Sequence, residues 1–416
     1  MYKRQPDILR YELENADLIV AHNAEFDMNI YECVAVEDYD FPEIPREKWY
    51  CSSAQARVNG LPASLDDAAW ALGLKSRKMS AGKGLIKALS LPQPDGSFNT
   101  DPDLIGQMGE YCMQDVVVTA NLIRSTRPMT QMEHADWLKT VEVNDRGVQI
   151  DRELASLALG YAEIEKHEIA EQLSELTEGV VTAHTQSARL RNWVLQQQPD
   201  LKEYMEVWKG DKQTLSLDKN IRRNILTDAE NGEKIIYPKV KKVIELFDDG
   251  NKSSVAKFKR MLNLADDTDG RVRGAFLFAG ATQTLRYTSR GLQLHNMRRD
   301  CCDADETEVL KELMANGHDL NAVGGTMNAL SKLLRPAIVP DEGNVLVVGD
   351  WSAIEARVLP WLSDTDGGDA KLAIFESGKD IYIETVSYTH LRAHETTSHI
   401  AYAVFCLKRG GGGGGG

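Results

Sequence analysis

Two short apolar runs, each followed at once by polar residues and a helical pattern, restrict the fold of this chain more than any other feature. The run at 17–21, DLIVA, precedes HNAEFD, and the run at 345–350, VLVVGD, ends in Asp350. Strands that deliver polar side chains at their carboxyl ends are typical of α/β functional sites. We therefore predict a strand at each place, with a helix to about Cys33 after the first and a helix from about Ser352 after the second.

Helical periodicity dominates the rest of the chain. Residues 104–124 carry Tyr111 and Asp115 four positions apart, on one face of an expected helix. The sequence SLDD at 64–67 resembles a helix N-terminus with an acidic first turn. Charged helical sequence extends from about 151 to 264, with breaks near 210–219 and 229–238, whereas RVRGAFLFA at 271–279 is typical of a strand. Together these segments predict an α/β (α+β) fold class.

The length of 416 residues predicts about two or three domains with ordinary cores, and the 42% of hydrophobic residues excludes wholesale disorder. No run of about 18 apolar residues is present, so we expect no membrane span. The six cysteines form no CxxC pair, and the first residues lack the apolar segment of a signal peptide. A reducing, cytoplasmic location is therefore expected. The absence of a GxxxxGK[ST] loop disfavours an ATP-driven helicase.

The two ends of the chain resemble translated library DNA. If YKRQ at 2–5 is encoded TAT AAG AGA CAG, the reverse complement in a shifted frame encodes VSY at 386–388. The next residues, THLRAHET at 389–396, continue the translation of a transposase-type sequencing adapter, and seven glycines end the chain. The alternative is a natural glycine-rich tail. We predict that residues 1–5 and 386–416 are adapter artefacts and that 6–385 is an internal fragment of a longer protein.

Residues 6–385 are strongly acidic but contain one basic segment. They carry 43 basic and 62 acidic side chains, a net charge of −19 compared with −15 for the whole chain. This balance excludes a uniformly basic nucleic-acid coat. The 29 residues of 271–299 nevertheless hold no acid and six arginines, namely Arg271, Arg273, Arg286, Arg290, Arg298 and Arg299. We favour phosphate binding by this segment over a solvated charged face, because such faces normally mix both signs.

Asp27 and Asp115 are the first candidate metal-binding carboxylates. Either acid alone is more simply a capping or surface carboxylate. Together, N-x-x-F-D at 23–27 and Y-x-x-x-D at 111–115 resemble the second and third motifs of 3′–5′ exonucleases. The resemblance implies that Asp27 and Asp115 bind metal ions and that Tyr111 orients the attacking water. It also gives Asn23 and Phe26 a supporting role at the strand end or on DNA. The first motif of that family, D-x-E, is absent, and we expect it to precede the fragment.

The sequence DWSAIEAR at 350–357 resembles motif A of the family A DNA polymerases, those of the DNA polymerase I type. A strand-to-helix turn without chemistry is the alternative. The resemblance implies that Asp350 binds the two catalytic ions with help from the backbone of Trp351. Glu355 would exclude a ribose 2′-hydroxyl, and Arg357 would be structural or lie near the primer. The residues implied in nucleotide binding are Trp351, Ser352, Ile354 and Glu355.

The basic segment carries a related resemblance. The pattern T-x-R-x-x-S at 284–289, followed by L-Q-x-x-N at 292–296, is similar to the duplex-contacting palm segment of the same polymerases. Arg286 would then contact the minor groove near the primer end. The sequence at 250–263 is similar to the thumb helix that holds the duplex backbone, although an ordinary helix surface explains it nearly as well. The DNA-binding candidates are Arg271, Arg273, Arg286, Ser289, Arg290, Gln293, His295, Asn296, Arg357, Lys252 and Lys257.

The resemblance covers essentially residues 15–385 and implies three regions. These are a partial RNase H-like exonuclease domain at 6–140, a linker and helical thumb at 141–270, and part of the polymerase palm at 271–385. The implied function is template-directed DNA synthesis by two-ion nucleotidyl transfer, with proofreading. Mg²⁺ is the implied cofactor, and primer–template DNA, deoxynucleoside triphosphates and a processivity factor are the candidate partners. The location would be a bacterial or phage-infected cell.

Two alternatives belong to other functional classes. One is a DNA-binding protein without catalysis, and the other is a 3′–5′ exonuclease alone. Glu355 argues against both, because neither needs a filter for the sugar. The fragment lacks the fingers and the second palm aspartate of the polymerase family. We therefore expect residues 1–416 to bind primed DNA weakly and to lack efficient catalysis.

Overall fold

The computed structural model describes residues 7–252, 256–320, 323–381 and 383–384. The terminal segments interpreted as adapter sequence therefore lie outside the described residues. The chain divides into two compact units, with the boundary in the sequence between Asn344 and Val345. The predicted boundaries after residues 140 and 270 fall inside the first unit and stay predictions. No helix of the described part combines the length and the apolar character needed to cross a membrane.

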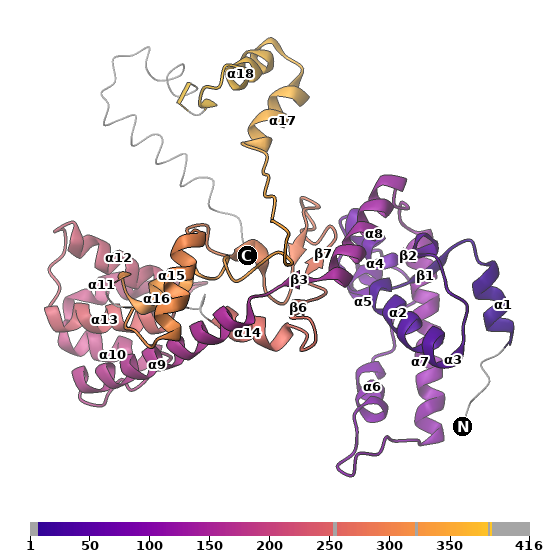
Figure 1. Ribbon diagram of the computed structural model, residues 1–416, viewed down its shortest axis with the longest axis horizontal. Coiled ribbons are helices and arrows are strands. Elements are labelled where there is room, and N and C mark those ends of the chain that lie inside the picture. Colours follow the sequence, from indigo (N-terminus) through magenta and orange to yellow (C-terminus); the bar gives the residue numbers. More distant parts are fainter. Residues whose placement is uncertain (1–6, 253–255, 321–322, 382, 385–416) are drawn as a thin grey trace. The chain divides into compact units, whose positions relative to one another are not determined.

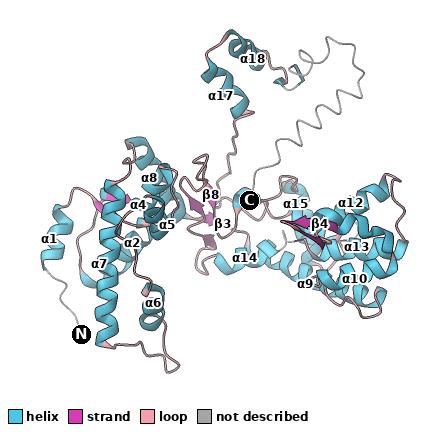
Figure 2. Ribbon diagram, turned by 180° about the vertical axis from the view of Figure 1, so that it is seen from behind, coloured by secondary structure: helices cyan, strands magenta, loops and turns pink. Residues whose placement is uncertain are grey.

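Helices predominate in both units, and the strands are short (Figure 2). The described residues form four two-stranded sheets, one parallel and three antiparallel. Separate helical and small antiparallel elements make an α+β arrangement, as predicted. The RNase H-like fold of the N-terminal region stays a prediction, since the described residues contribute one two-stranded sheet there.

The N-terminal region is built around the parallel pair of β1 and β2. In register, Ile19 lies opposite Trp49 and Ala21 opposite Cys51. Parallel strands require a crossover connection, and α2, η1 and α3 provide it. The predicted strand at 17–21 is confirmed, and the helical run after it continues beyond Cys33. The elements are α1 (Asp7–Asn15), β1 (Ile19–Ala21), α2 (Ala24–Ile30), η1 (Tyr31–Val36), α3 (Glu37–Tyr39), η2 (Arg46–Lys48), β2 (Trp49–Cys51) and α4 (Ser52–Val58).

Four further helices complete this region: α5 (Leu65–Ala71), α6 (Gly82–Ser90), α7 (Pro102–Arg124) and α8 (Gln131–Arg146). The predicted helix at 104–124 is confirmed as α7. Its start follows from the sequence, because Asp101 caps the amides of Asp103 and Leu104 while Pro102 occupies the first turn. Thr130 and Glu133 form a capping box at the start of α8.

The region from 151 to 264 is helical, as predicted, and its first break is a hairpin. Ile169 and Leu173 of α9 pack with Val243 and Phe247 of α13 in one buried cluster. The elements are α9 (Arg152–Leu176), α10 (Ser187–Gln197), η3 (Pro199–Leu201), α11 (Lys202–Met205), β4 (Glu206–Lys209), β5 (Lys212–Leu215), α12 (Lys219–Glu230), α13 (Pro238–Gly250) and α14 (Ala256–Leu264).

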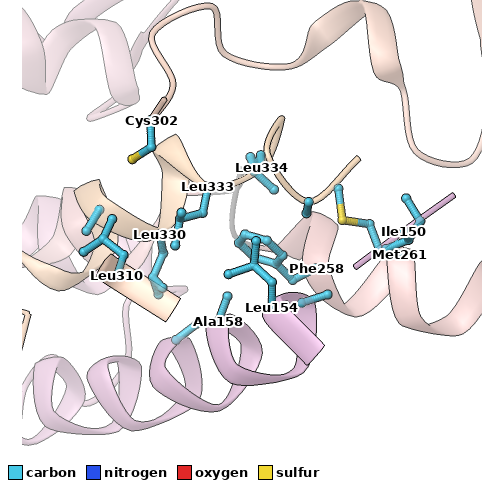
Figure 3. Close-up of a cluster of buried hydrophobic side chains, with 14 of the residues drawn as sticks. Ile150, Leu154, Ala158, Phe258, Met261, Cys302, Leu310, Leu330, Leu333 and Leu334 are labelled. Atoms are coloured by element: carbon cyan, nitrogen blue, oxygen red, sulfur yellow. The ribbon is translucent and has the colours of Figure 1, made fainter. Parts of the chain in front are cut away.

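A second core joins the first half of α9 to segments much later in the chain. Figure 3 shows Leu154 and Ala158 of α9 gathered with Phe258 and with Leu330 and Leu333. Backbone pairing of Ile150 with Ile338 brings the later segment back to the start of α9. The later elements are η5 (Leu294–Asn296), α15 (Ala304–Ala315) and α16 (Thr326–Lys332) (Figure 1).

The continuous strand predicted at 271–279 is wrong, because Gly274 divides it. Gly274 has a φ of 66°, a left-handed conformation that suits glycine, and its N–H donates to the carbonyl of Asn144. The first half, β6 (Arg271–Val272), pairs with β3 (Val148–Gln149), and the second half, β7 (Phe276–Leu277), pairs with β8 (Thr288–Ser289). The segment therefore serves two sheets.

The strand predicted at 345–350 is also wrong. Residues 345–350 form no strand, and Val347 and Val348 are 92% and 89% exposed. An isolated strand leaves its backbone groups without ladder partners, and no described residue pairs with this run. The helix predicted to follow is confirmed as α17 (Ile354–Ser363), and α18 (Asp366–Glu376) comes after it.

Candidate functional site

Asp27 and Asp115, which are about ninety positions apart in sequence, line one cavity. The cavity has a volume of about 320 Å³, and His22 and Lys78 also line it. Asp27 comes from α2, directly after β1, and Asp115 comes from α7. We call this cavity the carboxylate pocket. Partial burial raises the pKa of the Asp27 carboxyl above its ordinary value.

One oxygen of the Asp115 carboxylate forms an ion pair, and the other has no hydrogen-bond partner among the described residues. Asp115 Oδ2 lies 2.7 Å from Lys78 Nζ, while Asp115 Oδ1 is buried. Burial alone would lower the pKa of Lys78, but the contacts with Asp115 and Tyr111 together outweigh burial, and the pKa is raised. Lys78 is therefore a cation held inside the pocket, and the sequence patterns gave no reason to select it from the basic run KSRK at 75–78.

His22 and Tyr111 border this arrangement. The His22 ring bonds to Ser52 Oγ at 2.8 Å and to the Ala63 carbonyl at 2.9 Å, and burial lowers its pKa. Tyr111 lies one turn before Asp115, with its ring 5.1 Å from Lys78 Nζ. The ring also packs directly on the backbone of Gly82, where a Cβ would lie only 2.3 Å from it. Glycine at 82 thus makes room for Tyr111.

The residues present do not complete a two-ion metal site. The pocket offers two carboxylates, one of which is already paired with Lys78, and a two-ion site requires several hard oxygens at one point. Across the described ranges, no group of three or more His, Cys, Asp or Glu side chains is placed to hold a metal ion. The free acceptor at Asp115 Oδ1 is compatible with a ligand but does not supply the missing coordination.

The basic segment is less positive in the fold than in the sequence. Arg271 pairs with Asp341, Arg273 with Asp266 and Asp269, Arg290 with Glu25, and Arg298 with Asp300. Within the described residues, at least four of its six arginines thus contact carboxylates from outside the segment. Phosphate binding by this segment stays a prediction, but part of its positive charge is neutralised by acids that a count along 271–299 does not include.

The predicted groove residues do form a connected turn. Ser289 Oγ bonds to His295 Nδ1 at 2.8 Å, and the backbone N–H of His295 also donates to it. Gln293 has a φ of 51° and precedes η5, which contains Asn296. Lys257 of α14 donates to the Gln293 carbonyl at 3.2 Å, and burial lowers the pKa of Lys257. The thumb-like helix and the turn are therefore joined.

Two other DNA-binding candidates are Lys252 and Arg286. Lys252 pairs with Asp249 at 2.7 Å, an ordinary contact within one helical turn. Ser253 and Ser254, which follow Lys252 in the thumb-like sequence at 250–263, lie outside the described residues. Arg286 follows Leu285, whose φ is 53°, in the loop between β7 and β8.

The motif at 350–357 lies in the second unit. Asp350 is exposed, and Trp351 is 78% exposed. Ala353, with a φ of 50°, precedes the first turn of α17, which contains Ile354 and Glu355. Arg357 donates to the Ser352 carbonyl at 2.9 Å and lies over the ring of Phe375. These contacts give Arg357 a structural role within the unit.

In comparisons with known proteins, the chain is similar to proteins named as DNA polymerases. No protein-family model matches the chain. The DNA polymerase of Bacillus phage SP02 is 30% identical over 380 residues, which cover 87% of this chain and 53% of that protein. The thermostable DNA polymerase I of Thermus thermophilus is 44% identical over 59 residues, 14% of this chain and 7% of that protein.

Among solved structures, the POL domain of Pol1 from M. smegmatis, in complex with DNA primer-template and dNTP, has a TM-score of 0.49. It is 16% identical and covers 91% of this chain and 55% of that chain. The chain spans about half the length of the phage relative that it matches.

Proposed function

We propose that this chain, which is similar to one phage DNA polymerase over 87% of its length, is part of a family A DNA polymerase that extends a primer on a DNA template. The similarity to the phage polymerase is the observation that carries the proposal. The DWSAIEAR sequence at 350–357 supports the family assignment. Primer–template DNA and deoxynucleoside triphosphates are the proposed substrates of the whole protein, with Asp350 as a catalytic carboxylate and Glu355 as the sugar filter.

The carboxylate pocket supports a second activity in the same protein, the removal of 3′ nucleotides. Two acids from separate helices meet in one cavity, and one of them keeps an unpartnered buried oxygen within the described structure. Metal-assisted phosphodiester hydrolysis requires several carboxylates that converge on one point, and these two would form part of such a set. Mg²⁺ is the proposed cofactor, because it prefers carboxylate oxygens. The further ligands would come from the part of the protein that this chain does not cover.

The test uses the whole protein in primer-extension and 3′-trimming assays. Asp350→Asn is expected to lower extension at least about 100-fold, since removing a metal ligand costs several kcal/mol of transition-state stabilisation. Asp364→Asn is its control, because Asp364 ends α17 in a left-handed conformation that asparagine tolerates. Asp27→Asn should abolish trimming and leave extension intact, and exposed Asp67 of α5 supplies the matched control for it. Extension that survives Asp350→Asn would refute the polymerase assignment.

A further inference from the structure

One contact ties the helix that carries Asp27 to the hairpin that carries the predicted primer-contacting segment. Glu25 lies in the first turn of α2, two positions before Asp27. Its Oε2 accepts from the Arg290 guanidinium at 3.1 Å, and Arg290 follows the last residue of β8. The two partners are separated by 265 positions in the sequence.

Asn144 of α8 braces this ion pair. Its side-chain Nδ2 donates to Glu25 Oε1 at 2.5 Å and to the Phe276 carbonyl at 3.0 Å. Its Oδ1 accepts from the Phe276 N–H at 2.8 Å. Asn144 is 2% exposed, so water does not compete for the hydrogen bonds by which this amide connects α2 to β7.

The Glu25 side chain is largely buried, with 18% of its surface exposed. Burial raises the pKa of Glu25, while the bonds from Asn144 and Arg290 oppose that shift. A mostly buried carboxylate depends on its partners far more than a surface carboxylate does, because losing one partner leaves charge without compensation. Arg290 is itself fixed by its bond to the Gly274 carbonyl.

The geometry of α2 converts this contact into a constraint on Asp27. Residues two apart in an α-helix project about 200° apart. Glu25 accordingly lines a cavity together with Asn144 and Arg290, whereas Asp27 lines the carboxylate pocket on another side of α2. A shift of the hairpin that pulls on Glu25 would therefore move Asp27 relative to Asp115.

We propose that Glu25 and Arg290 are positioning residues that couple the hairpin of β7 and β8 to the carboxylate pocket, so that the state of the primer-contacting segment adjusts 3′-nucleotide removal. The proposal rests on the proposed function for its consequence in catalysis. The sequence suggests only DNA binding for Arg290. The proposal adds a role for Arg290 in holding Asp27 in place.

The experiment compares Glu25→Gln, Arg290→Gln and the double variant in the whole protein. Two measurements are made: trimming of a single-stranded oligonucleotide, and hydrogen exchange of peptides covering α2. Each single variant is expected to slow trimming and speed exchange in α2 by about tenfold, the size expected for a hydrogen bond to a charged group. The double variant should be no worse than either single one, since both remove the same contact.

The surface pair Glu133 and Arg127 supplies matched controls, because it is a bidentate ion pair in the same unit that joins the first turn of α8 to the loop before it. Glu133→Gln and Arg127→Gln should leave exchange in α2 unchanged. Unaltered exchange in α2 for Arg290→Gln, or additive effects in the double variant, would overturn the coupling. If the unaltered protein trims no DNA, the proposed exonuclease function fails, and the exchange measurement alone still decides the coupling.

Discussion

Replacing Asn144 should loosen the junction between α8, α2 and β7 by an amount that follows from its bonds. Asn144→Ala removes the donors to Glu25 and to the Phe276 carbonyl, and the acceptor of the Phe276 N–H. At about 1 kcal/mol for each hydrogen bond, the loss is about 3 kcal/mol. That is a large fraction of the roughly 5–15 kcal/mol by which a typical domain is stable.

The isosteric change Asn144→Asp should cost more than Asn144→Ala. It keeps the shape but replaces the N–H donor with a carboxylate oxygen opposite Glu25 and the Phe276 carbonyl, so that like charges face each other in a buried place. Hydrogen exchange of peptides covering 274–290 measures the effect. A loss of about 3 kcal/mol corresponds to roughly 100-fold faster exchange where opening is local.

Asn121→Ala is the control for these variants, because Asn121 makes one side-chain bond, to Ser76, in another part of the same unit. It should leave exchange at 274–290 unchanged. If Asn144→Asp were milder than Asn144→Ala, the amide could not be donating to Glu25, and the reasoning would fail. The reasoning would also fail if peptides covering 274–290 were equally protected from hydrogen exchange in all variants.

Three further predictions concern stability and the pocket. The bonds from Arg127 lower the pKa of Glu133 to about 2 from 4.5, so this contact stabilises the fold above pH 4.5 and its contribution is lost as the pH falls toward 2. Because the pair lies at the surface, Glu133→Gln should cost only about 1 kcal/mol at pH 7 and less near pH 2, as measured by urea denaturation at both pH values. Phe258→Ala should destabilise the core of Figure 3 by about 3–5 kcal/mol, since the side chain is fully buried, and a thermal melt that matches the unaltered protein would contradict this. Gly82→Ala should displace the Tyr111 ring and reduce 3′ trimming while leaving primer extension intact, and an unchanged trimming rate would show that the ring position is unimportant.

Local signals in the sequence were sufficient for several elements. Asp101 and Pro102 define the start of α7, and the apolar run before His22 gives β1. The resemblance to exonuclease motifs implies that Asp27 and Asp115 act in one place, and the fold brings them to one cavity. Each of these features depends on residues close in sequence or on a pattern that a family resemblance supplies.

The predictions were wrong where the structure depends on residues that are distant in the sequence. The apolar residues Val345 to Val348 have the composition of a strand, but a strand also needs a partner, and the described residues do not offer one. Gly274 divides the strand expected at 271–279 because its N–H is taken by the Asn144 carbonyl, more than a hundred positions away. Lys78 and Glu25 were missed for the same reason, since their roles arise from contacts made across the fold.

The core around Trp49 and Trp137 has a consequence for synthesis of the protein on the ribosome. Its N-terminal members are complete by residue 141, yet Phe278 and Ala279 belong to the same buried cluster. A nascent chain that has emerged only to residue 141 therefore carries an apolar surface that its own later residues have still to cover. This surface can be covered only after residues 278 and 279 have been synthesised, and a shorter chain ending at residue 141 would leave it exposed to chaperones and to aggregation.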